Sequence, residues 1–91
     1  MRRPGFVLVP KMWLEELRAM NATGSTWAVA MELLYRARFS PIVKLSNEAA
    51  AKMGLSPRTK WRAIDALRKR ALIAVTGRPG TSPRIRVRWL D

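Results

Sequence analysis

The chain of 91 residues is long enough for one small domain with a single core, and its net charge is +12. Residues 1–43 carry six Lys or Arg against three acids, or +3, whereas residues 44–91 carry twelve against three, or +9. Because cysteine and histidine are absent, disulfides, zinc sites with the usual sulfur or imidazole ligands, and histidine-assisted serine or cysteine catalysis are excluded.

The N-terminal segment predicts an extended lead rather than a targeting signal. Residues 1–5 are expected to form a loose basic arm. Phe6–Val9 is an apolar run that Pro10 ends, and it is either a short strand or an extended lead packed on the next helix. This run is too short for a signal peptide, and no apolar run approaches the roughly 20 residues of a membrane span. A cytoplasmic protein is therefore expected.

Two amphipathic helices are expected next. The first covers Lys11–Met20, because apolar residues recur there at helical spacing. These residues are Trp13, Leu17 and Met20. The second begins at a Ser25 or Thr26 cap and runs to about Phe39, just before Pro41. One side of this second helix is expected to carry Trp27, Met31, Leu34, Tyr35 and Arg38.

Another pair of helices, a short one and a long one, follows, and a tight turn joins them. Ser46 is expected to cap a helix over Asn47–Met53, which Gly54 ends through its left-handed backbone. Ser56 is the next cap, and the helix Pro57–Ala71 begins with a proline at the first helical position, where a missing N–H costs nothing. The arrangement presents one long helix on a short support.

Three short strands are expected around these helices. Ile42–Leu45 and Leu72–Thr76 have β character, residues 77–83 form a turn-rich loop, and Arg84–Trp89 alternates strictly between apolar and basic residues. The last two strands therefore predict a hairpin. The alternation places three arginines on one strand face, where they repel and need a counter-charge, either from nucleic acid or from Glu15, Glu16 or Glu32 of another segment. These arginines are Arg84, Arg86 and Arg88.

The helix over 57–71 has an apolar stripe and a basic stripe. The apolar stripe consists of Ile64, Leu67 and Ala71, and the opposite stripe consists of Arg58, Arg62, Asp65 and Lys69. Asp65 is placed to pair with Lys69 one turn later. Such a helix, entered through a short turned helix, is typical of proteins that read the major groove of DNA.

Each polar residue of this helix suits a particular contact. Ser56, Arg58 and Thr59 lie at the helix N-terminus, where free N–H groups and the helix dipole favour phosphate. Arg58 and Arg62 can also make the bidentate contact to guanine that discriminates between bases. Lys69 lies nearly three turns farther along and is expected to meet a phosphate.

Two residues of the same helix have an ambiguous direction. Trp61 lies at the margin of the apolar face, which favours the edge of the core over the alternative of stacking on a sugar or touching a thymine methyl. Lys60 lies towards the apolar side, and its stem is expected to cross the core so that its ammonium reaches solvent or phosphate.

The run LSNEAAAKMGLSPRTKWRAIDALRKRALI, followed by a hairpin, resembles the winged helix-turn-helix DNA-binding domains of bacterial regulators. It is most similar to small helix-turn-helix proteins of bacterial plasmids and mobile elements, whose typical run is S-x-x-T-x-x-R-A-[IL]-x-x-L-x-x-x-G-L-I. The matching residues are Ser56, Thr59, Arg62, Ala63, Ile64, Leu67, Leu72 and Ile73. Ala71 departs from the usual glycine, and Lys60 replaces a common aliphatic residue.

The resemblance covers roughly residues 42–90 and implies a mainly α fold with a small β hairpin. A single domain over 1–91 is expected, with about four helices and a two- or three-stranded antiparallel sheet. The flexible arm is 1–5, the helical support 6–40 and the winged-helix core 42–90. The helix over 57–71 would enter the major groove, and the wing over 77–83 would lie on the backbone or in the minor groove. The implied DNA-binding residues are Asn47, Ser56, Arg58, Thr59, Lys60, Trp61, Arg62, Lys69 and Arg78.

The expected function is sequence-specific binding of double-stranded DNA, in a bacterial transcriptional regulator or a mobile-element maintenance protein associated with the nucleoid. The alternatives are a binder of structured RNA or the ribosome, and a winged helix that binds only protein. Residues 6–40 are expected either to supply a homodimer contact or to pack in the chain's own core. Because the six acids are dispersed, no enzyme activity is expected, and neither is a cofactor, a metal, a small-molecule ligand or a membrane partner.

Overall fold

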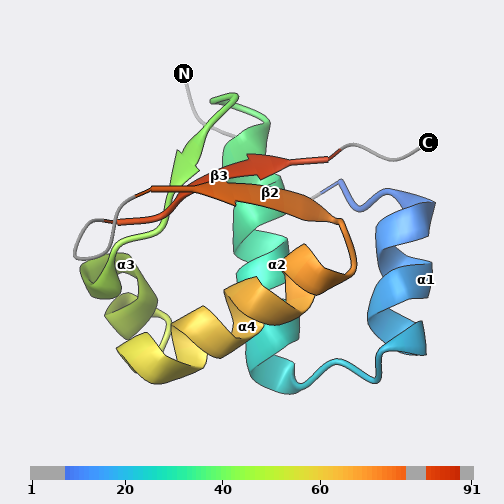
Figure 1. Cartoon of the computed structure of the whole chain (residues 1–91), viewed down its shortest axis with the longest axis horizontal. Coiled ribbons are helices and arrows are strands. Elements are labelled where there is room, and N and C mark those ends of the chain that lie inside the picture. Colours follow the sequence, from blue (N-terminus) through green and yellow to red (C-terminus); the bar gives the residue numbers. More distant parts are fainter. Residues whose placement is uncertain (1–7, 78–81, 89–91) are drawn as a thin grey trace.

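The computed structural model describes residues 8–77 and 82–88, which form four helices and a three-stranded antiparallel sheet (Figure 1). The helices are α1 (Lys11–Ala19), α2 (Gly24–Ala37), α3 (Asn47–Lys52) and α4 (Pro57–Lys69). The strands are β1 (Val43–Lys44), β2 (Ile73–Thr76) and β3 (Arg84–Val87). The expectation of a mainly α fold with a small antiparallel sheet is confirmed. The expected arm, residues 6–7, Arg78 of the wing and Trp89 lie outside the described residues.

The sheet has β3 in its centre, paired on one side with β1 and on the other with β2. Val75 lies opposite Ile85 in the β2–β3 hairpin, and Val43 lies opposite the same Ile85 across β1. Alternation along β3 buries Ile85 and Val87 and exposes Arg84 and Arg86. The expected hairpin is therefore confirmed, and the sheet presents one apolar face to the core.

One hydrophobic core joins the helices to the sheet. It contains Trp13 and Leu17 of α1, Leu33 of α2, Leu67 of α4 and Ile85 of β3, all without measurable exposure. Fully burying side chains of this size stabilises the fold by about 1.5–3 kcal/mol each. Because α2 contacts both α4 and β3, and α4 contacts β2, the core lies between α2, α4 and the sheet.

The position of α2 differs from the expectation in two ways. Thr23 caps the helix, with its Oγ1 accepting a hydrogen bond from the Thr26 N–H at 3.2 Å, so the Ser25 or Thr26 cap is wrong. The buried face is also rotated from the expected one, and it consists of Thr26, Val29, Ala30, Leu33 and Leu34. Trp27 and Met31 are only partly buried. Apolar residues occur on several sides of α2, so their spacing alone does not identify the face that the core covers.

Three helix ends share one device, a Schellman motif closed by a residue with left-handed backbone. In α1 this residue is Asn21 (φ 52), in α3 Gly54 (φ 79) and after α4 Ala71 (φ 58). The N–H of Ala71 donates to the Arg68 carbonyl at 2.9 Å, and the next N–H donates to the Leu67 carbonyl at 3.2 Å. Ala71 thus adopts a backbone conformation that glycine takes more easily, and it does so at an energetic cost.

Residues 6–40 were expected to supply either a dimer contact or part of the chain's own core. Trp13, Leu17 and Leu34 are fully buried within this single chain. The Trp13 indole N–H also donates to the Arg88 carbonyl at 2.8 Å, which ties α1 to the end of β3. These three side chains therefore serve the core, and they are not available to a second subunit.

Candidate nucleic-acid interface

The support helix and the long helix both begin at serine caps. The Ala49 N–H donates to Ser46 Oγ at 3.1 Å at the start of α3, and the Thr59 N–H donates to Ser56 Oγ at 3.2 Å at the start of α4. Pro57 follows the second cap as the first helical residue. Both caps were expected from the sequence, and both are confirmed. They fix where α4 starts and leave its N-terminus at the surface.

The turn between α3 and α4 depends on Gly54. Its N–H donates to the Ala51 carbonyl at 2.9 Å, and the Leu55 N–H donates to the Ala50 carbonyl at 2.9 Å. A Cβ added at Gly54 would meet no atom within 4 Å, so the requirement for glycine comes from its φ of 79° and not from crowding. The turn directs α4 across α3 (Figure 1).

The side of α4 that faces inward packs in the core. Ala63, Ile64 and Leu67 are buried there, as the apolar stripe predicted. The opposite side presents Arg58 and Arg62, which are exposed. In the described part of the chain, neither of these two arginines forms an ion pair with a carboxylate. We call Arg58, Trp61 and Arg62 the α4 surface.

The cations in the C-terminal half of α4 share one acidic partner. The Asp65 carboxylate pairs with Lys69 at 3.1 Å, as expected, and also accepts a hydrogen bond from Arg68, which the sequence did not single out. The hydrogen bond from Arg68, followed by that from Lys69, lowers the pKa of Asp65. Lys69 was expected to meet a phosphate, and in this structure it meets Asp65. The free cations of the helix are therefore at its N-terminal end.

Lys60 does not reach solvent, so the expectation that its ammonium would be exposed is wrong. Its side chain is 2% exposed, and its ammonium donates to the Leu45 carbonyl at 3.2 Å and to Asn47 Oδ1 at 2.7 Å. A buried ammonium needs such acceptors, and the stem is just long enough to find them at the start of α3. Burial lowers the pKa of Lys60. Lys60 thus ties α4 to the β1–α3 junction.

Trp61 faces outward, so the interpretation as a core-edge residue is wrong. Its side chain is 45% exposed, and Lys60 Nζ lies 5.1 Å from the centre of its ring. Trp61 therefore adds an exposed aromatic ring to the helix that carries Arg58 and Arg62. Asn47, another expected contact, is also exposed, but its carboxamide oxygen is occupied by Lys60. Thr59 is half-buried, and its hydroxyl accepts a hydrogen bond from Ser56 Oγ at 3.0 Å.

A second basic surface lies on the outer face of the sheet. Arg84, Arg86 and Arg88 are exposed, as the alternation predicted, and Lys44 of β1 lies directly opposite Arg84 in register. The acids that were expected as counter-charges are paired elsewhere in the described part of the chain. The pairs are Glu15 with Lys11, Glu16 with Arg70 and Glu32 with Arg36. Lys44 was missed because strand pairing between distant segments leaves no local signal. We call Lys44, Arg84 and Arg86 the sheet surface.

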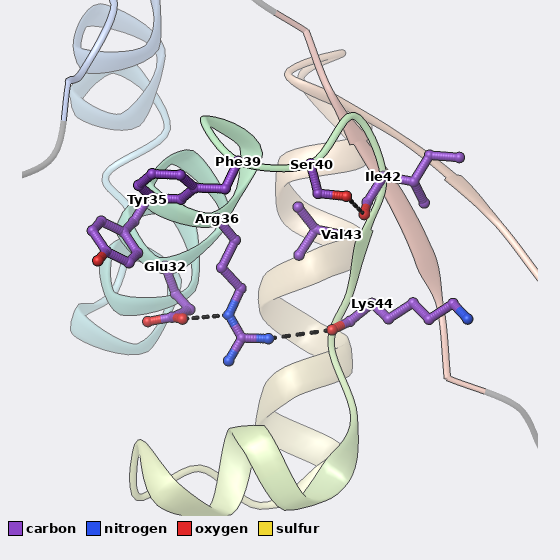
Figure 2. A pocket seen from close by; sticks show the side chains of 8 residues that line it. All are labelled: Glu32, Tyr35, Arg36, Phe39, Ser40, Ile42, Val43 and Lys44. Carbon is purple, nitrogen blue, oxygen red and sulfur yellow. Dashed lines mark hydrogen bonds and ion pairs between the residues drawn. The ribbon is translucent and has the colours of Figure 1, made fainter. Parts of the chain in front are cut away.

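A hollow lies between the C-terminal end of α2 and β1 (Figure 2). Tyr35 and Phe39 line one side in an edge-to-face contact of 5.4 Å between ring centres. Arg36 crosses the floor, bonded to Glu32 and to the Lys44 carbonyl at 3.3 Å. Arg36 therefore connects α2 to β1. The described residues contain no group of three or more acids that would hold a metal ion.

Comparisons with family models, with curated proteins and with solved structures found no match to this chain. Within residues 8–77 and 82–88, no helix combines the length and the apolar character that crossing a bilayer requires. The case for a function rests on the residues and their geometry.

Proposed function

We propose that the protein binds double-stranded DNA sequence-specifically, with α4 in the major groove and the wing over 77–83 on the backbone or in the minor groove. The observation that carries the proposal is the α4 surface itself. Arg58 and Arg62 are one turn apart, exposed and without an acidic partner among the described residues, and they stand on a capped helix that a shorter helix supports. This combination suits bidentate recognition of guanine.

The neighbouring residues support the same assignment. The N-terminus of α4 is exposed at Ser56, Pro57 and Arg58, where the positive end of the helix dipole attracts phosphate. Trp61 offers an exposed ring on the same helix as the two arginines, suited to a sugar or a thymine methyl. The net charge of +12 adds a general attraction to a polyanion through counterion release.

Within this proposal, the protein acts as a bacterial transcriptional regulator or as a maintenance protein of a mobile element, in the cytoplasm and on the nucleoid. Because Trp13 and Leu17 are used by the core, any pairing of subunits on DNA relies on other residues. A palindromic binding site would indicate that two copies bind together.

The test begins with a selection of bound sequences from a randomised duplex library. The complex of the protein with a selected duplex is then challenged with unlabelled duplex DNA or duplex RNA, and the displacement by each competitor is compared. A defined motif with guanines, lost when Arg58 and Arg62 are replaced by alanine, is the expected result. Preferential binding of duplex RNA would contradict the proposal, because the deep and narrow major groove of A-form RNA does not admit a helix. Enrichment of no motif would contradict the sequence-specific part.

A further inference from the structure

The sheet surface carries a concentration of positive charge that the fold does not balance. Lys44 and Arg84 are directly opposite across the β1–β3 pair, where side chains approach to about 5 Å. Arg86 follows two residues later on the same strand face, at about 7 Å. Like charges in these positions destabilise a sheet. Among the described residues, no carboxylate pairs with any of the three.

The chemistry of this surface favours nucleic acid over protein. On β2, Ala74 lies opposite Arg86 and Thr76 lies opposite Arg84; both are exposed and small, so this side of the surface offers no large apolar side chain. Protein interfaces place apolar and aromatic anchors at the centre and charges at the rim. Here the charges are central, and Ile42, which is 41% exposed, lies at the margin. Interfaces with DNA are the more positively charged and polar kind.

The sheet surface and the α4 surface face different directions. The inner sides of α2, α4 and the sheet meet around one core, so their outer sides point away from it along diverging lines (Figure 1). A duplex is stiff over short lengths, and it does not bend around a domain of this size without a cost of several kcal/mol. A straight duplex seated on α4 therefore leaves the sheet surface open to another.

We propose that the sheet surface binds the phosphate backbone of a second DNA duplex, so that one protein holds two duplexes together. The proposal builds on the proposed function, because the first duplex is the one on α4. The second contact is made by Lys44, Arg84 and Arg86 as point charges on phosphates, and it is independent of base sequence.

A bridging assay tests this directly. The selected duplex is immobilised on beads, the protein is bound to it, and a fluorescent duplex of unrelated sequence is then offered as the second partner. The wild-type protein is expected to capture the fluorescent duplex, and capture is expected to fall steeply as salt is raised. The variant Arg84→Thr/Arg86→Thr is expected to lose capture by about tenfold or more, while its retention on the immobilised duplex changes less than about twofold.

Two matched variants control for charge and for folding. Lys11→Gln/Arg18→Gln removes the same two charges from the exposed side of α1 and is expected to capture like the wild type. Arg84→Lys/Arg86→Lys keeps both charges and is expected to retain capture, because a phosphate contact needs charge and not a fork-shaped donor. Thermal unfolding checks the fold, and Arg84→Thr/Arg86→Thr is expected to melt at the same or a higher temperature, since repulsion is relieved.

Several outcomes overturn the proposal while leaving the proposed function intact. In the first, the wild type binds the immobilised duplex but does not capture the fluorescent one. In the second, Arg84→Thr/Arg86→Thr captures as much as the wild type. In the third, Lys11→Gln/Arg18→Gln loses as much capture as Arg84→Thr/Arg86→Thr does. If Arg84→Thr/Arg86→Thr instead weakens binding to the immobilised duplex, the sheet surface extends the first contact. If polyglutamate of equal charge displaces the fluorescent duplex as well as free duplex does, an acidic protein is the better partner.

The proposed function fails in a different way. If Arg58→Ala/Arg62→Ala leaves binding to the immobilised duplex unchanged, then α4 does not carry recognition. Continued dependence of capture on Arg84 and Arg86 in that case would still assign the sheet surface to the captured duplex, with the immobilised duplex held by a surface other than α4.

Discussion

The α4 surface and the sheet surface are both basic, yet they are built differently. On α4 the cations project from a convex helix whose capped N-terminus is exposed, and Asp65 pairs with both cations of the C-terminal half. On the sheet the cations stand on adjacent strands, with Lys44 opposite Arg84 and no acid paired with them in the described part of the chain. A single convex helix fits the major groove and reaches base edges, whereas cations spread over the face of a three-stranded sheet are placed to meet the phosphates on the outside of a duplex. Positive charge alone therefore does not distinguish a surface that recognises bases from one that contacts only phosphates. The secondary-structure element that carries the cations makes this distinction.

The largest effect is expected from removing the two arginines of the α4 surface, Arg58 and Arg62. Arg58→Ala/Arg62→Ala is expected to weaken specific DNA binding by about 100-fold or more, because each bidentate arginine contributes about 1–3 kcal/mol. Fluorescence anisotropy on the selected duplex measures the change, with Lys11→Gln/Arg18→Gln as the charge-matched control. An equal loss in both variants would erase the distinction between the two surfaces, since it would mean that only net charge matters.

The support of α4 is tested through Lys60. Lys60→Met keeps the stem but removes the hydrogen bonds to the Leu45 carbonyl and Asn47. The unfolding free energy is expected to fall by about 2 kcal/mol, the usual value for hydrogen bonds from a charged donor. Lys52→Met, at an exposed position of α3, is the control and is expected to change little. Urea unfolding measures both, and equal stability of Lys60→Met and the wild type would mean that the buried ammonium does not hold α4.

The unfolding free energies of the wild type and Lys60→Met are also expected to depend differently on pH. Burial lowers the pKa of Lys60 in the folded state below its unfolded value, so the unfolded chain binds more protons between the two values. The unfolding free energy of the wild type therefore gains a contribution as pH rises through that window, and Lys60→Met lacks it. The difference in stability between the two is expected to widen with rising pH. A difference that is constant with pH would contradict the assignment.

A smaller effect is expected at the junction between the two surfaces. Ala71→Gly relieves the left-handed backbone after α4 and is expected to raise the unfolding free energy by about 1 kcal/mol. Ala66→Gly, inside α4, is the matched control and is expected to lower it by about the same amount. DNA affinity and duplex capture are expected to stay unchanged in Ala71→Gly. Altered binding would indicate that the strained junction sets the angle between α4 and the sheet.

The smallest effect is expected from removing the acid of α4, which leaves its cations without a carboxylate partner, like those of the sheet surface. Asp65→Asn frees Arg68 and Lys69 from their carboxylate partner, so that phosphates can take its place. Affinity is expected to rise a few-fold, and the salt dependence of binding is expected to steepen by up to about 0.9 per added phosphate contact. Because Asp65 loses its ion pairs as pH falls through its lowered pKa, wild type and variant should converge in acid. No change in salt dependence would place these cations away from DNA.

The parts of the fold that could be predicted are those with local causes. The caps at Ser46 and Ser56 depend on residues three positions away, and the turn at Gly54 depends on a backbone conformation that glycine alone adopts easily. Alternation along β3 likewise follows from its own sequence. For the same reason the α4 surface was largely visible, because one helix carries Arg58 and Arg62.

The parts that could not be predicted depend on distant segments. Lys60 finds its acceptors at Leu45 and Asn47, so its burial requires the α3–α4 crossing to be known. The juxtaposition of Lys44 with Arg84 requires the β1–β3 register, and residues 45–83 separate them. Trp61 lies near a boundary on the helical wheel, where a small rotation decides between core and solvent. In each case the deciding contact is tertiary.

The hydrogen bond from the Trp13 indole to the Arg88 carbonyl spans 75 residues and joins the first helix to the end of the last described strand. During synthesis α1 leaves the ribosome long before β3 exists, so Trp13 then lacks both its acceptor and the sheet side of its core. Contacts between such distant segments form late, because closing the long loop costs entropy first. The nascent chain is therefore expected to stay protease-sensitive until β3 has emerged, and to close around Trp13 in one final step.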